Sequence, residues 1–414
     1  MATRSSLGCL ETPARPARRV DLNHFQVARA KTARDINRCI VLNLIRKHQP
    51  ISRADLARHS RLQRNTVSAI TEQLIAERWV TMGALENIPR GRKPTFLHLN
   101  GDRAAILGVD VRPTETTIAV ADLNLQFLAL ETIPTRDDPR QFISDLCKRI
   151  QHLVRSHSRL SFDGIGMVLP GRVDLASGRL AFAPNLAWKA IDLKRPIEQA
   201  TGLPVEQENA ANACALAEIW SGRHSEQVRN LIAVTISEGI GVGMILNGQL
   251  VRGAAGLAGE FGHVTIQADG PLCNCGNRGC LEACGSNTAA VRYFNEIVAD
   301  EGGGTSATFS FETILRLVEK GDACACAALH RMAQSLGIGM AMLVTGLSPD
   351  VIVLIGEVTS AWERIGPIIK ETVEQRLVTE LHTRILPADP RTQPRLRGAI
   401  TLVLQKHFST PQIA

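Results

Sequence analysis

The sequence contains no apolar run long enough to cross a lipid bilayer. A membrane-spanning helix needs about 18 or more apolar residues in succession, and the longest candidate, 338–355, is interrupted by Ser348, Pro349 and Asp350. This interruption predicts a helix, a turn and a buried strand. Because no apolar stretch follows the N-terminal arginines, no signal peptide is expected. We therefore expect a cytoplasmic protein without membrane insertion.

Acidic residues are scarce in the first quarter of the chain. Residues 1–100 carry 18 Lys and Arg against 7 Asp and Glu, a net charge of +11. The remaining residues carry 29 against 33, a net charge of −4, so the whole chain has +7. A basic region on an acidic body favours a polyanionic partner for the N-terminal region. A solvated basic surface would carry the same charge, so the motifs must distinguish a polyanion-binding region from such a surface.

The chain lacks short repeats, and its only low-complexity tract is residues 1–30. This tract mixes Pro, Arg, Ala and Ser with few apolar anchors, which predicts a flexible basic arm. The full chain has 414 residues, of which 44% are hydrophobic and 21% charged. Such a length and composition suit two or three globular domains.

Residues 31–100 have the pattern of a winged helix-turn-helix. Apolar residues recur at helical spacing over 36–45, and a third helix is expected from about 63 to 78. Between these helices, Ser52 and Asp55 form a weak capping box at the start of a second helix. The second helix is expected to end before a turn at residues 59–62.

The second helix of such a pair lies in the DNA major groove. The positions that would face the groove are Gln63, Arg64, Asn65, Thr66 and Ser68. Arginine can pair with guanine, asparagine or glutamine with adenine, and serine or threonine with phosphate. A helical hairpin that only packs would have the same three helices, so a second signal is needed.

A basic hairpin supplies that signal. Expected strands at 79–82 and 95–99 flank the proline-bounded tip PRGRKP, which carries Arg90, Arg92 and Lys93. A tip of this kind can enter a narrow minor groove, although a solvated basic turn would look similar. The helix pair, the hairpin and the basic arm together predict binding to double-stranded DNA.

Three cysteines and a histidine lie close together in the second half of the chain. The four candidate ligands are His263, Cys273, Cys275 and Cys280. Three thiolates and an imidazole form the four-coordinate set that structural Zn²⁺ sites use, and they leave no position for a reactive water. A cluster of buried thiols or a disulfide is the alternative, which a reducing cytosol disfavours.

Other cysteines are weaker candidates for metal ligands. Cys284 is a nearby thiol and a possible rival ligand. Cys324, Cys326 and His330 lie on an expected helix, where a Cys-x-Cys pair points its thiols to different sides. We therefore interpret these three side chains as packing residues.

Beyond residue 100 the pattern alternates between strands and helices, which predicts an α/β fold. The first expected element is an antiparallel meander of three strands at 105–109, 117–121 and 127–132. A helix at 141–156 is expected to follow it. Further strands are expected at 165–169, 231–237, 242–246 and 351–355.

These motifs together resemble the ROK family, which combines sugar kinases with sugar-responsive repressors. The run GIGVGMILNGQLVRGAAGLAGEFGHV is similar to the family signature, and the spacing from His263 to Cys280 resembles its zinc site. The head that ends in GRKPTFLHLN resembles the repressor branch. The resemblance covers nearly the whole chain.

The resemblance implies an actin-like ATPase fold of two lobes around a sugar cleft. One lobe would comprise residues 101–213, completed by a helix near 398–407 within about 396–414. The other lobe would comprise residues 214–395 and carry the zinc loop. The sugar contacts implied by matching motif positions are Asn185, Asn209, Glu260, His263 and Glu282. Each of them has an alternative role as a cap or a satisfied buried group.

The chain departs from the kinase members of the family at four places. Those kinases have an aspartate base directly after the Asn of the ENDAN pattern, where this chain has Ala210. The phosphate loop DIGGT appears as DVRPT at 110–114, which removes both glycines. The second loop has Ser237-Glu238 in place of Gly-Thr, and a triple glycine appears as IGE at 355–357. Together these departures predict that the chain does not transfer phosphate.

The sequence therefore predicts a DNA-binding repressor of sugar metabolism with a degenerate kinase domain. Expected partners are double-stranded DNA, a sugar effector or a sugar-transport protein, and further copies of the chain in a dimer or tetramer. Two alternatives remain open. One is a sugar kinase with an atypical active site, and the other is a DNA binder that responds to no sugar.

Overall fold

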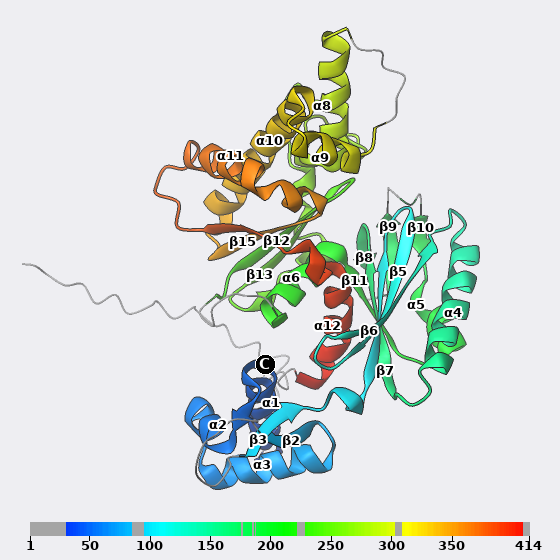
Figure 1. Cartoon of the computed structure of the whole chain (residues 1–414), viewed down its shortest axis with the longest axis vertical. Coiled ribbons are helices and arrows are strands. Elements are labelled where there is room, and N and C mark those ends of the chain that lie inside the picture. Colours follow the sequence, from blue (N-terminus) through cyan, green and yellow to red (C-terminus); the bar gives the residue numbers. More distant parts are fainter. Residues whose placement is uncertain are drawn as a thin grey trace, which may run out of the picture. The chain divides into compact units, whose positions relative to one another are not determined.

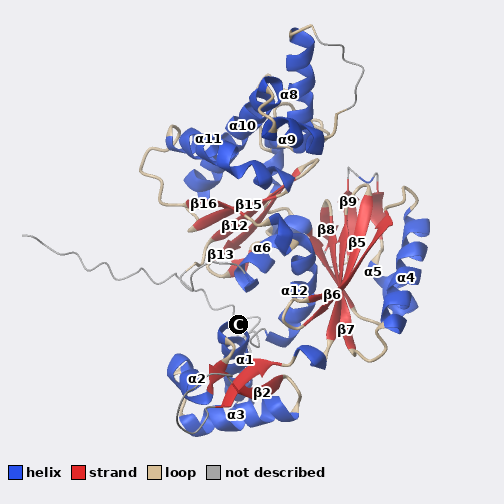
Figure 2. Cartoon of the chain, viewed as in Figure 1, coloured by secondary structure: helices blue, strands red, loops and turns tan. Residues whose placement is uncertain are grey.

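The computed structural model describes residues 30–84, 95–174, 177–183, 186, 188–221, 228–302 and 309–408 (Figure 1). The chain divides into two compact units. The head unit comprises Met1–His98 with Phe408–Ala414, and the body unit comprises Leu99–His407. Both units contain helices and strands (Figure 2), in agreement with the predicted α/β class. None of the described helices has the length and apolar content that crossing a membrane requires.

The head unit has three helices and a small sheet of strand order β1-β3-β2. Its elements are α1 (Ala30–His48), β1 (Ile51–Ser52), α2 (Arg53–Ser60), α3 (Arg64–Ala76), β2 (Val80–Ala84) and β3 (Thr95–Leu99). Ser52 caps α2: its hydroxyl oxygen accepts from the Asp55 backbone N–H at 3.1 Å, and its O–H donates to Asp55 Oδ2 at 2.7 Å. The predicted start of the second helix, with Ser52 as its N-cap and Asp55 bonded to it, is therefore confirmed.

Apolar side chains of all three helices form the core of the head unit. The buried residues are Val41, Leu42 and Ile45 of α1, Leu56 of α2, and Val67, Ile70 and Leu74 of α3. Burial of each such side chain contributes about 1.5–3 kcal/mol to folding. Phe408, the last described residue, belongs to the same unit: its ring meets Trp79 edge-on at 6.1 Å.

The first sheet of the body unit has strand order β11-β7-β4-β5-β6. Its strands are β4 (Ala105–Val111), β5 (Glu115–Asp122), β6 (Phe127–Pro134), β7 (Phe162–Leu169) and β11 (Val205–Asn209), after a short helix η1 (Gly101–Arg103). β4, β5 and β6 pair as the predicted antiparallel meander, whereas β4, β7 and β11 are parallel. Helices α4 (Pro139–Ser156) and α5 (Lys194–Thr201) pack on this sheet. A three-stranded ribbon of β8 (Arg172–Asp174), β9 (Arg179–Ala183) and β10 (Trp188–Ile191) extends this half.

The second sheet of the body unit has strand order β14-β13-β12-β15-β16. Its strands are β12 (Leu231–Ile236), β13 (Ile240–Leu246), β14 (Gln249–Leu250), β15 (Val351–Ile355) and β16 (Arg384–Pro387). The helices around it are α7 (Leu281–Gly285), α8 (Asn287–Asp300), α9 (Phe311–Glu319), α10 (Ala323–Leu347) and α11 (Trp362–Glu374). The predicted helix, turn and strand over 338–355 are confirmed, because α10 ends at Leu347 and β15 begins at Val351. Short helices are η3 (Ala254–Gly256), η4 (Glu260–His263), η5 (Glu357–Ala361) and η6 (Pro390–Thr392).

Two helices, α6 (Ala210–Ser221) and α12 (Pro394–Phe408), lie between the two five-stranded sheets (Figure 1). A Cβ at Gly166 of β7 would collide with the Ala399 carbonyl of α12, and one at Gly243 of β13 would collide with the Ala211 carbonyl of α6. These glycines therefore allow the helix backbones to lie directly on the sheets. We call the half around the first sheet the first lobe and the half around the second sheet the second lobe.

Candidate functional site

The predicted metal ligands lie together in the second lobe. His263 ends η4, and the three cysteines follow on the loop that leads to α7. One ligand atom from each of His263, Cys273, Cys275 and Cys280 lies within 4.8 Å of the others. The Cys275 and Cys280 sulfurs are 3.7 Å apart, and Cys273 Sγ is 3.7 Å from His263 Nδ1.

The separation of the Cys275 and Cys280 sulfurs fits a tetrahedral ion. Zinc–sulfur bonds of about 2.3 Å at tetrahedral angles place two sulfurs about 3.7–3.8 Å apart. The Cys275–Cys280 separation of 3.7 Å equals this spacing. The cluster can therefore hold a metal ion through three sulfurs and one imidazole nitrogen.

A tight loop positions the three cysteines. Cys273 N–H donates to the Asn277 carbonyl at 2.8 Å, and Thr265 pairs with Cys280 through an isolated antiparallel bridge. Gly279 adopts φ +62°, and a Cβ there would collide with the Gln267 carbonyl. Only glycine fits this position, so the loop closes around the ligand atoms.

Cys284 is not part of the metal-ligand group. It lies in α7, is buried, and its Sγ is 4.0 Å from Gln267 Oε1. Cys324 and His330 lie on α10, as predicted, and Cys324 Sγ contacts Glu301 Oε2 at 3.1 Å. Among the described residues, the group of three or more potential ligands includes none of these side chains.

A cavity of about 560 Å³ lies in the body unit beside the four candidate metal ligands. Its lining comes from both lobes: 170–173 and 208–212 lie at the ends of β7 and β11, and the second lobe contributes Thr235, Ser237, 239–242, Arg252, 256–260 and His263. This volume lies in the usual range for small-molecule sites, about 300–1,000 Å³. Asn209, Glu260, His263 and Glu282 all line it, whereas Asn185 lies outside the described residues.

The imidazole of His263 connects the metal cluster with the cavity. Its Nδ1 faces Cys273 Sγ, while its Nε2 lies 3.8 Å from Glu260 Oε2. The Glu260 side chain is 52% exposed and lines the cavity. The two ring nitrogens therefore face two different groups, so a metal held by Nδ1 would fix the direction of Nε2.

Asn209 and Glu282 are partly committed to bonds within the protein. Asn209 Nδ2 donates to the Gly171 carbonyl at 2.7 Å, and its Oδ1 accepts from the Ala211 N–H at the start of α6. Glu282 Oε2 accepts from the Ile240 N–H at 2.9 Å. The alternative structural role therefore holds for part of each side chain. Glu260 and His263 remain the stronger candidates for contact with a ligand in the cavity.

One ion pair of the cavity wall, between a half-buried arginine and a buried carboxylate, does not follow from the sequence motifs. Arg252 Nε lies 2.9 Å from Glu208 Oε2, and the Glu208 side chain is 4% exposed. Glu208 Oε1 also accepts from Asn212 Nδ2 at 3.2 Å. Glu208 directly precedes Asn209 in the ENAAN run, and a buried acid needs a cation. The sequence gives no signal that Arg252, 44 residues away, supplies it.

The family resemblance implies that Ala210 replaces the base of the kinase members. It is the first residue of α6, it lines the cavity, and its methyl group packs with Val168, Ala213 and Ala399. A methyl group accepts no proton, so this position supplies no general base.

The predicted DNA-contacting residues of the head unit lie at the start of α3. Gln63, Arg64 and Asn65 are exposed, and Thr66 and Ser68 are half-buried. The far end of α3 contacts α1, where Arg34 Nη2 donates to Gln73 Oε1 at 3.3 Å. These contacts leave the N-terminal turn of α3 accessible. Arg90, Arg92 and Lys93 lie outside the described residues.

Comparison with known proteins adds three findings. The model of the ROK family matches residues 106–406. A xylose repressor from Caldicellulosiruptor bescii is 29% identical over 395 residues, covering 92% of this chain and 98% of the repressor. A crystal structure of a ROK family transcriptional regulator, described as a homologue of the E. coli MLC protein, superposes with a TM-score of 0.76 at 28% identity. It covers 91% of this chain and 97% of the regulator.

A kinase structure matches a smaller part of the chain. The ROK family glucokinase from Streptomyces griseus, solved with glucose and AMPPNP, has a TM-score of 0.66 at 27% identity. The match covers the whole glucokinase but only 73% of this chain. The family match begins at residue 106, after the head unit. The regulators therefore match more of this chain than the glucokinase does.

Proposed function

Because this chain belongs to the ROK family, we propose that it is a sugar-responsive transcriptional repressor without kinase activity. One observation carries the proposal: a helix-turn-helix unit and a cavity with Glu260 and His263 occur in one chain, which is similar over nearly its full length to a xylose repressor. The regulated genes would then belong to sugar metabolism. The protein would act on them through DNA and not through catalysis.

The effector site is the cavity of the body unit. Carboxylate, amide and imidazole groups bind sugar hydroxyls through paired hydrogen bonds, and these groups come from Glu260, Asn209 and His263. Glu282 and Asn185 complete the proposed set. The effector is a small sugar or a sugar carried by a transport protein.

The metal of the cluster is Zn²⁺ in a structural role. Three sulfurs and one nitrogen match its preference, and four protein ligands leave no open position. When bound, the ion supplies rigidity to the loop between η4 and α7. His263 Nε2 then points into the cavity at a fixed angle.

The head unit binds double-stranded DNA. Gln63, Arg64, Asn65, Thr66 and Ser68 would read the major groove, and Arg90, Arg92 and Lys93 the minor groove. Residues 1–30 would add a basic arm, and residues 101–213 and 214–395 would form the two lobes. A homodimer or tetramer would place two heads on half-sites about one helical turn apart, or a multiple of it.

Arg64→Ala is expected to raise the Kd for the specific DNA site about 5- to 150-fold. Arg64 is exposed at the first residue of α3, and a base contact of this kind is worth about 1–3 kcal/mol. Fluorescence anisotropy on a duplex selected from a random pool measures the Kd. Arg140→Ala, which removes an exposed arginine of α4 in the body unit, should leave it unchanged. Equal Kd values for wild type and Arg64→Ala would refute the role of Arg64.

A sugar kinase with an atypical active site is the competing function, favoured by the glucokinase match. A coupled assay of ATP consumption across common hexoses and amino sugars separates the two functions. We expect no turnover above background, because Ala210 offers no base and 110–114 lacks the two glycines of a phosphate loop. Sugar-dependent turnover that Glu260→Ala abolishes would establish the kinase instead.

A DNA binder that responds to no sugar is the third possibility. Thermal denaturation of the full chain against a panel of sugars distinguishes it. A sugar that binds the folded cavity raises the Tm, since ligand binding to the native state stabilises it. If no sugar of the panel raises the Tm, the sugar-sensing part of the proposal fails, and the DNA-binding part stands on the Arg64 experiment.

A further inference from the structure

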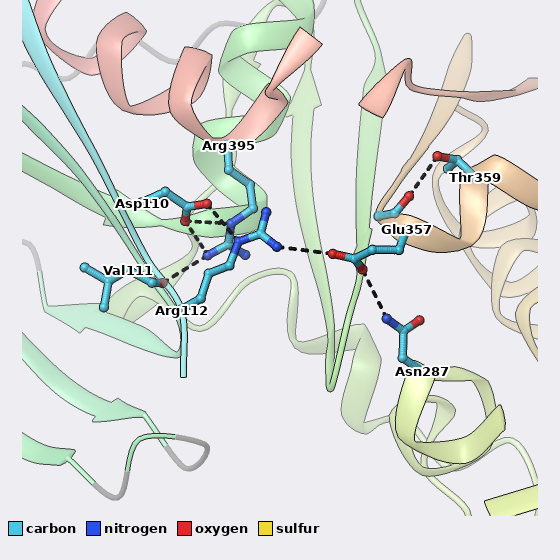
Figure 3. Close-up of polar contacts among 8 residues, drawn as sticks. Asp110, Val111, Arg112, Asn287, Glu357, Thr359 and Arg395 are labelled. Carbon is cyan, nitrogen blue, oxygen red and sulfur yellow. Dashed lines mark hydrogen bonds and ion pairs between the residues drawn. The ribbon is translucent and has the colours of Figure 1, made fainter. Parts of the chain in front are cut away.

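A chain of ion pairs joins the two lobes of the body unit (Figure 3). Arg112 directly follows β4 of the first lobe, and Glu357 begins η5 of the second lobe. Arg112 Nη1 lies 3.2 Å from Glu357 Oε1, and Arg112 Nε donates to Asp110 Oδ2 at 3.0 Å. We call the Arg112–Glu357 pair the interlobe clasp.

Both ends of the clasp are held by further contacts. Asp110 is buried, and Arg395 of α12 donates through Nε to Asp110 Oδ1 at 2.7 Å and through Nη2 to the Val111 carbonyl at 3.1 Å. At the other end, Asn287 Nδ2 donates to Glu357 Oε2 at 3.1 Å. Because each charged group is already oriented by a neighbour, forming the pair costs less side-chain entropy than a free surface pair does.

The clasp consists of residues that interrupt the kinase pattern. Arg112 stands in DVRPT, where the resembling kinases have DIGGT, and Glu357 stands in IGE, where they have three glycines. The backbone of Asn287, which contacts Glu357, donates to the carbonyl of Ser237 at 2.8 Å, in the third altered segment. Two of the altered segments therefore bond to each other directly through Arg112 and Glu357, and Asn287 links Glu357 to the third.

We propose that the interlobe clasp holds the lobes at the spacing at which the cavity binds its sugar, so that Arg112 and Glu357 are positioning residues for the effector. Asn209 belongs to the first lobe and Glu260 and His263 to the second, so one sugar reaches all three only at a particular lobe spacing. Arg395 lines the cavity and also bonds Asp110, which links the cavity wall to the clasp. The inference rests on the proposed function, because it concerns the same sugar site.

The test is a calorimetric titration of the full-length, zinc-loaded protein with D-xylose, D-glucose and N-acetyl-D-glucosamine. Glu357→Gln keeps an acceptor for Asn287 but removes the charge, and it should raise the sugar Kd about two- to fivefold at low salt, because the clasp is partly exposed. Arg112→Gln should have the same effect. At about 0.5 M salt, screening weakens the Arg112–Glu357 pair of the wild type. The difference in sugar Kd between the wild type and the variants should therefore shrink.

The matched control is Asp145→Asn. It breaks the Arg136–Asp145 pair, which has similar exposure and a 3.4 Å separation but lies within the first lobe. The double variant Arg112→Gln/Glu357→Gln should lose no more affinity than Arg112→Gln alone, since the pair is already broken in that single variant. Additive losses, or a Glu357→Gln affinity equal to that of Asp145→Asn, would overturn the proposal.

A second measurement needs no sugar and keeps the clasp testable if none of the three sugars binds. In hydrogen–deuterium exchange of the free protein, Glu357→Gln should accelerate exchange at 111–115 in the first lobe as well as at 356–361. Acceleration confined to 356–361 would show that the charge acts only within the second lobe. Absence of binding by the wild type would count against the proposed function, whereas the exchange result decides the clasp.

Discussion

Cys280→Ser is expected to release the metal from the purified chain and to weaken sugar binding about 10- to 100-fold. Cys280 is fully buried, and its sulfur lies 3.7 Å from Cys275 Sγ at the centre of the ligand group. A serine hydroxyl is a poor zinc ligand, and three remaining ligands hold the ion weakly. Without the ion, His263 loses the partner that orients its ring, and losses of this size follow when such orientation is removed.

Elemental analysis and calorimetric titration with the sugar measure these two effects. The control is Cys284→Ser, which changes another buried thiol only four residues away that lies outside the ligand group. It should keep near-stoichiometric zinc and wild-type affinity. A wild-type chain without zinc, or equal metal loss from both variants, would refute the structural zinc site.

Glu260→Ala is expected to raise the Kd for the sugar about 10- to 150-fold. Glu260 lines the cavity with an exposed carboxylate beside His263 Nε2, and hydrogen bonds to charged groups contribute about 1.5–3 kcal/mol each. Glu260→Gln, which keeps an acceptor without the charge, should lose less affinity. Calorimetric titration with the sugar that raises the Tm gives the Kd of each variant.

Glu296→Ala is the control for this prediction. Glu296 also lies in the second lobe and is similarly exposed, but it pairs with Arg292 and Arg331 and does not line the cavity. Its removal should leave the sugar Kd unchanged. If Glu260→Ala binds the sugar as tightly as Glu296→Ala does, the sugar does not contact Glu260, and the assignment of the cavity fails.

Features that depend on neighbours in the sequence could be predicted. The N-cap of α2 needs only the Ser52 hydroxyl and the Asp55 backbone N–H three residues later, and the metal-ligand group draws all its members from residues 263–280. Hydrophobic periodicity also predicted the meander and the strand at 351–355, because each strand buries its apolar residues in a sheet.

Features that depend on distant residues could not be predicted. The Arg395–Asp110 bond joins residues 285 positions apart, and no local spacing encodes it. Strand β1 has two residues and exists only because it pairs with β3. The turn expected at 59–62 begins later, because α2 continues to Ser60 and Arg61 adopts the left-handed φ of 59° that ends it. A left-handed arginine is uncommon, so the sequence did not indicate it.

Asn209 illustrates a limit of carrying a role over from a motif. Its position in ENAAN predicted a sugar contact, and the side chain does line the cavity. The same side chain also donates to Gly171 and accepts from the first turn of α6, because β11 passes directly into that helix. A residue at such a junction uses part of its hydrogen-bonding capacity within the protein, and only the remaining donors and acceptors can bind a ligand.

The affinity of the full chain for its selected DNA duplex, measured by anisotropy with and without saturating sugar, shows whether the cavity controls DNA binding. We expect the sugar to change the Kd for DNA about 5-fold or more, the usual size of coupling between two sites. Glu260→Ala should abolish the change at the same sugar concentration. An unchanged Kd for DNA, under conditions in which the sugar raises the Tm and is therefore bound, would contradict sugar-responsive DNA binding.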